Sequence, residues 1–166
     1  MRPAAILLML CLCPSCATQK GAAPALDIRS QAEVRNFQTR SYAIADQPLV
    51  MKAMINVLQD LNFIVKTADA QLGVITAEKW SNIEHSRKEI KRAKKDKVGL
   101  AEAAVLECTA NVSIYGNDTR VRVTFQQRIV GPGGTVMNVT RVEDAAFYQE
   151  FFAKVGKGIF LQQEGI

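Results

Sequence analysis

Histidine is nearly absent from this 166-residue chain, and its scarcity argues against several kinds of chemistry. The single histidine, His85, lies in a strongly charged segment near Glu84 and Glu89. A metal site needs three or four converging ligands, and serine-type hydrolysis needs a histidine that a third group holds in place. We therefore expect no metal site, no cofactor and no catalytic residues, and we expect that the protein is not an enzyme.

Cysteine is equally scarce after the N-terminal stretch, where Cys108 is the only one beyond Cys16. An isolated cysteine within an apolar alternation is typically a small buried hydrophobic residue, and we interpret Cys108 in that way. A phosphate-binding loop is also missing. The glycine-rich segment at 131–134 is not followed by Lys-Ser/Thr or by a predicted helix, so it is interpreted as a hairpin turn.

The longest apolar run is short and lies near the N-terminus. Ala4–Leu12 contains nine apolar residues behind Arg2, whereas a transmembrane helix needs about 20. A basic residue followed by a short apolar run and small residues is typical of a secretory signal peptide, which we place at 1–15.

The end of this signal, Cys13-Pro14-Ser15-Cys16, resembles a bacterial lipobox. The resemblance implies cleavage before Cys16 and lipidation of its thiol, so that two or more acyl chains hold the protein on a membrane. Ala17 follows the cysteine, which by the same resemblance favours the outer membrane, with the protein facing the periplasm. The alternative is ordinary cleavage after Ala17 or Ala25 and secretion into the periplasm.

The remaining chain is predicted to form one domain. Residues 16–33 are small and polar and indicate a lipidated cysteine with a flexible tether, and residues 34–166 indicate a single α+β domain with a charged insertion at 81–106. That insertion is interpreted as helical or partly disordered. The expected strands are 34–44, 63–68, 74–80, 107–115, 119–130 and 135–142, and the expected helices are 47–60 and 145–162.

Apolar periodicity gives the fold class. Apolar residues recur every three or four positions along 47–60, as on an amphipathic helix covering a sheet. In the strands, alternation points one set of side chains inward: Cys108, Ala110, Val112, Ile114, Val121, Val123, Phe125 and Ile129. We predict a two-layer α+β fold, with a mostly antiparallel sheet of about five or six strands and two helices on one face. The other face is polar and suited to water.

Two charged surfaces are candidates for binding. The net charge is +5, and the segment Glu84–Lys97 alone holds seven basic and three acidic residues. Its candidate electrostatic contacts are Arg87, Lys88, Lys91, Arg92, Lys94 and Lys95. They suit anionic lipid headgroups, lipopolysaccharide phosphate or an acidic partner protein, and the alternative is a merely solvated helix face. Nucleic acid is not expected as a partner of an exported protein.

The second candidate is the polar face of the sheet. Arg120, Arg122 and Arg128 alternate along one predicted strand, and Tyr115 and Asn111 lie on the neighbouring strand. We interpret these residues as a candidate docking face, with ordinary solvation as the equal alternative.

Three segments resemble a family of mostly uncharacterised bacterial lipoproteins: VLQDLNF at 57–63, LGVITAEK at 72–79 and FYQEFFAKVGKGIFL at 147–161. The layout is also similar to the helix-grip domains of the lipoprotein C subunit of the outer-membrane β-barrel assembly machinery. These motifs are structural, so the resemblance implies an envelope location and a fold without implying an activity.

Together these features favour a membrane-anchored, non-enzymatic lipoprotein that acts as a binding or assembly-accessory module of the cell envelope. The alternative hypothesis is a carrier of a small apolar ligand, held in a cavity between the helix layer and the sheet. Such a carrier would need a large apolar pocket bounded by the helix at 47–60 and by Phe125, whereas a fully packed interior would count against it.

Overall fold

The computed structural model describes residues 28–165, so the predicted signal peptide at 1–15 and the lipidation at Cys16 lie outside the described residues. The helices are α1 (Ile28–Phe37), α2 (Gln47–Asp60), α3 (Arg87–Asp96) and α4 (Ala145–Gln163). The strands are β1 (Thr39–Tyr42), β2 (Ile64–Asp69), β3 (Val74–Asn82), β4 (Ala103–Tyr115), β5 (Asp118–Val130) and β6 (Val136–Arg141). Within this part of the chain, no helix is both long and apolar enough to cross a bilayer.

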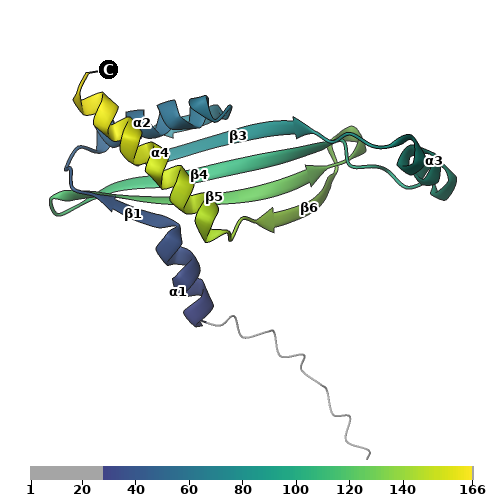
Figure 1. The fold of residues 1–166 in the computed structure, drawn as a ribbon, viewed down its shortest axis with the longest axis horizontal. Coiled ribbons are helices and arrows are strands. Elements are labelled where there is room, and N and C mark those ends of the chain that lie inside the picture. The colour runs from purple at the N-terminus through teal and green to yellow at the C-terminus, as the bar shows by residue number, and fades with distance from the viewer. Residues whose placement is uncertain (1–27, 166) are drawn as a thin grey trace, which may run out of the picture.

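All six strands form one antiparallel sheet, which confirms the predicted α+β fold class (Figure 1). The strand order is β1-β5-β4-β3-β2, and β6 pairs with the C-terminal half of β5, next to the part that pairs with β1. The long β4–β5 hairpin is the centre of the sheet, because its two strands pair along their whole length of 13 residues.

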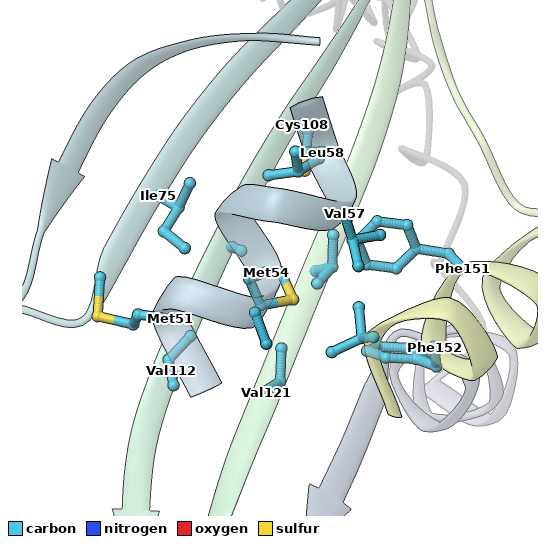
Figure 2. Close-up of a cluster of buried hydrophobic side chains, with 14 of the residues drawn as sticks. Met51, Met54, Val57, Leu58, Ile75, Cys108, Val112, Val121, Phe151 and Phe152 are labelled. Carbon is cyan, nitrogen blue, oxygen red and sulfur yellow. The ribbon is translucent and has the colours of Figure 1, made fainter. Parts of the chain in front are cut away.

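One face of the sheet, which we call the core face, packs against α2 and α4 (Figure 2). Its buried side chains are Ile75, Ala77, Cys108, Ala110, Val112, Val121, Val123 and Phe125. The helix α2 has the predicted bounds, and Asp46 caps it by accepting a 2.9 Å hydrogen bond from the Leu49 amide. Each fully buried Val, Ile or Phe side chain of the core face contributes roughly 1.5–3 kcal/mol to folding before the entropy cost is subtracted.

The first predicted strand, 34–44, is wrong for its first half, because helix α1 continues to Phe37 and β1 holds only four residues. Val34 and Phe37 are three residues apart and so lie on the same side of a helix. The centres of the Phe37 ring and the Tyr148 ring on α4 lie 5.2 Å apart, and this contact stabilises the helical conformation of the segment. The helix also begins at Ile28, inside the segment that was expected to be tether.

The charged insertion is shorter than the predicted 81–106. Strand β3 runs to Asn82 and β4 begins at Ala103, so the ends of that segment belong to the sheet. Val105 explains the extension: it is fully buried on the face opposite the core face, between its cross-strand neighbours Trp80 and Arg128. Ile114, expected to point into the core, is exposed because it lies beside the β4–β5 turn at the end of the sheet.

Candidate functional site

The first candidate surface is α3, which projects beyond the end of strands β3 and β4 (Figure 1). Local interactions hold this helix, since none of its residues is buried. Ser86 accepts a 3.3 Å hydrogen bond from the Glu89 amide, and the Glu89 carboxylate accepts a 2.8 Å bond from the Ser86 amide, forming a capping box. The Ser86 hydroxyl also donates a 2.7 Å hydrogen bond to this carboxylate, and that bond, together with the one from the Ser86 amide, holds the pKa of the Glu89 carboxyl below its usual value.

The structure places all six predicted electrostatic contacts on α3, where their side chains are exposed: Arg87, Lys88, Lys91, Arg92, Lys94 and Lys95. One of them, Arg92, lies 3.7 Å from the Asp96 carboxylate, and this exposed ion pair contributes little to stability. The helix therefore presents a compact group of positive charges at one end of the molecule.

A pocket of about 510 Å³ lies beneath α3. Its apolar lining includes Ile90 on the helix and Val98 and Leu100 on the following segment. Lys94 and Lys97 also line it. The exposed fractions of Ile90 and Val98 are 38% and 61%, so this apolar surface is open to solvent. Helix α3 and the pocket beneath it thus combine basic groups with an exposed apolar surface.

His85 also lines this pocket, where its Nε2 atom lies 2.6 Å from the Ala101 carbonyl oxygen. That contact ties the ring to the backbone of the segment that leads into β4. Among residues 28–165, no group of three or more potential metal ligands lies close enough to hold a metal ion.

The second candidate surface lies on the other side of the sheet, which we call the open face. Arg120 and Arg122 point to this face, and the register places Arg120 opposite Ser113 and Arg122 opposite Asn111. The Arg120 guanidinium carbon lies 4.1 Å from the centre of the Tyr115 ring, a cation–π contact that orients the side chain.

Arg120 and Arg122 line a second pocket, of about 250 Å³, together with Arg35 from α1. The remaining lining residues are Thr39, Asn111 and Ser113. The sequence interpretation missed Arg35, because its segment was expected to be a strand. No local signal in the sequence would have found it, since its place depends on α1 lying beside the edge strand β1. We call these six residues the arginine pocket.

Arg128, the third residue of the predicted docking face, does not belong to the arginine pocket. Its guanidinium forms a 2.8 Å ion pair with Glu107, and its Nε atom is buried without a hydrogen-bond partner. The register also places it directly opposite Val105, which is fully buried. This arginine therefore has a structural role in the sheet. Of the three arginines of the predicted docking face, only Arg120 and Arg122 line the pocket.

Aromatic rings pack closely around Phe125 in the interior. The ring of Phe125 lies 4.9–6.0 Å from those of Phe63, Phe147, Tyr148 and Phe151. Nearby, burial raises the pKa of the Cys108 thiol to about 12, so the thiolate needed for reaction is scarce at neutral pH. This packing counts against a ligand cavity bounded by α2 and Phe125.

No protein-family model matches the chain, and no curated protein matches it. Among solved structures, it is similar to the crystal structure of a DUF4468 family protein from Bacteroides ovatus ATCC 8483. The identity is 11% and the TM-score is 0.39, over 73% of this chain and 84% of that one. We draw no functional conclusion from a likeness this low.

Proposed function

We propose that the protein is a membrane-anchored, non-enzymatic lipoprotein that acts as a binding or assembly-accessory module of the cell envelope. The observation that carries this proposal is α3, a helix rich in basic residues and without a buried residue, at the end of the sheet. A helix with this composition contributes little to the core. Its charges are stabilised most when they approach an anionic surface, where each basic residue contributes about 1 kcal/mol to the free energy of binding.

The partner in this proposal is either anionic lipid or an acidic surface of another envelope protein. The Cys16 lipid anchor keeps the chain close to a membrane, and the pocket beneath α3 offers apolar contact beside the charges. The expected lipobox and the resemblance to bacterial lipoproteins support the envelope location, on the periplasmic side of the outer membrane. The packed interior favours this binding role over the carrier hypothesis.

Crosslinking in cells tests the binding role of α3. A photoreactive residue replaces Lys91 on α3 and, in a matched control, Lys52 on the exposed side of α2. We expect a specific lipid or protein adduct from position 91 and none from position 52, because only α3 presents the concentrated charge. Equal adduct patterns from both positions, or none from either, would contradict the proposal.

Cell fractionation tests the anchor separately. The Cys16→Ala variant is expected to leave the membrane fraction, because it cannot carry the acyl chains that hold the protein there. Quantitative retention of this variant in the membrane fraction would show that lipid on Cys16 is not the anchor.

A further inference from the structure

The arginine pocket gathers three positive charges, those of Arg35, Arg120 and Arg122. Its six lining residues include no carboxylate, and among residues 28–165 none of the three guanidinium groups forms an ion pair. Arg120 and Arg122 are two residues apart on one strand, so both side chains stand on the open face. Like charges held close together repel each other, and a bound anion would turn that repulsion into attraction.

Four different elements build the pocket: α1, β1, β4 and β5. The register places Arg122 between Thr39 on β1 and Asn111 on β4, while α1 brings Arg35 to the same place from outside the sheet. The hydroxyl groups of Thr39 and Ser113 and the amide of Asn111 add neutral donors beside the guanidinium groups. An anion entering here would meet charged and neutral hydrogen-bond donors from several directions.

The donors and the size of the pocket indicate the ligand. Guanidinium groups bind phosphate oxygens through two parallel hydrogen bonds, and these charge-assisted bonds are about twice as strong as neutral ones. The volume of about 250 Å³ lies below the roughly 300–1,000 Å³ typical of sites for drug-sized ligands. It therefore suits a phosphate group with a short attached moiety.

We propose that the arginine pocket is a binding site for a phosphate group. The group could belong to a soluble phosphate compound or to the headgroup of an anionic phospholipid, since both present the same oxygens. The site goes beyond the proposed function, because it lies away from α3: the β4–β5 register puts Arg120 and Arg122 near the Tyr115–Asp118 end, whereas α3 joins the sheet at Ala103.

Calorimetric titration of the full chain with inorganic phosphate, in non-ionic detergent, tests the site directly. The reference is a titration with chloride at equal ionic strength. We expect saturable binding of phosphate that the chloride titration does not show. The variants Arg122→Gln and Arg35→Gln should each weaken binding by about tenfold, because each removes charge-assisted hydrogen bonds. The matched control is Arg40→Gln, an exposed neighbour on β1 that does not line the pocket.

Vesicles distinguish the two sources of the phosphate group. The same four proteins, each with Cys16→Ala so that no acyl chain binds the vesicle by itself, are floated with vesicles of phosphatidylcholine alone or mixed with phosphatidylglycerol. Phosphate binding without variant-dependent flotation supports a soluble ligand, and weaker flotation of Arg122→Gln and Arg35→Gln on the anionic vesicles supports a headgroup. The proposal is overturned if neither probe binds, or if the pocket variants and Arg40→Gln behave alike with both probes.

Discussion

The two faces of the sheet carry side chains from the same strands and yet differ in what they do. On the core face, alternate residues of β3, β4 and β5 are buried against α2 and α4 (Figure 2). Phe125 lies at the centre of an aromatic cluster there. On the open face, the residues between them include Arg120 and Arg122, which are exposed and line a pocket. The core face holds the fold together, and the open face keeps charged groups available for binding.

This difference has a physical reason. Apolar burial stabilises the fold in proportion to the area removed from water, so the core face is stabilised by close packing. Charged groups lose hydration when they are buried, so the open face keeps its arginines accessible. Arg128 and Val105 are the exception, because near β6 the open face has a small buried cluster of its own.

The largest expected effect on stability comes from removing a large side chain from the core face. Phe125→Ala should lower the free energy of unfolding by about 3–5 kcal/mol, because it removes a ring that touches four other rings and leaves a cavity. The control is Gln126→Ala, the next residue on the open face, with an expected loss of less than about 1 kcal/mol. Chemical denaturation measures both. Similar losses would show that the two faces do not differ as described.

A smaller but still large effect is expected at Tyr148. Its buried hydroxyl accepts hydrogen bonds from the Phe125 amide at 3.1 Å and the Gln38 side chain at 3.3 Å, and it donates one to the Val142 carbonyl at 3.1 Å. Tyr148→Phe leaves these buried groups without their partner and should cost about 2–3 kcal/mol.

The control for this variant is Tyr115→Phe on the open face, whose ring is exposed and whose hydroxyl is expected to contribute almost nothing. Thermal unfolding followed by circular dichroism compares the two. If Tyr148→Phe is as stable as Tyr115→Phe, the hydroxyl does not join α4 to the sheet.

Local patterns were enough to predict most of the core face, with Ile114 as an exception, but the pocket on the open face depends on long-range contacts. The helix α2 and the alternation of Val121, Val123 and Phe125 were read correctly because period and burial agree within each segment. Helix α1 was missed because Phe37 gains its partner, Tyr148, from a distant part of the chain. Arg35 was missed for the same reason, since only the position of α1 brings it to the strands.

The pH dependence of stability should also report on the core face. The pKa of the Cys108 thiol is near 9.0 when unperturbed, and burial raises it to about 12 in the folded protein. Between these values the unfolded chain loses the proton and the folded chain keeps it. The contribution of the buried thiol to the free energy of unfolding is therefore complete below pH 9. It declines as the pH rises above 9, by at most about 1.4 kcal/mol per pH unit.

The variant Cys108→Ala removes this contribution. We expect the difference in free energy of unfolding between the original protein and the variant to shrink by more than about 1 kcal/mol from pH 8 to pH 10.5. Denaturation at several pH values measures it. Burial also raises the pKa of the Tyr42 hydroxyl, which remains in both proteins and gives each the same additional decline. A constant difference across this range would mean that the thiol titrates normally in the folded state.

The smallest effect on stability is expected in the arginine pocket. Arg122→Gln removes a charge that has no ion pair among the described residues and stands beside two other arginines, so stability should stay within about 0.5 kcal/mol or rise slightly. Arg128→Gln on the same strand is the matched contrast, because it breaks the 2.8 Å pair with Glu107 and should cost about 1 kcal/mol. Urea denaturation at low ionic strength separates the two. A binding site can lose a charge without harm to the fold, so an Arg122→Gln loss as large as that of Arg128→Gln would mark both arginines as structural.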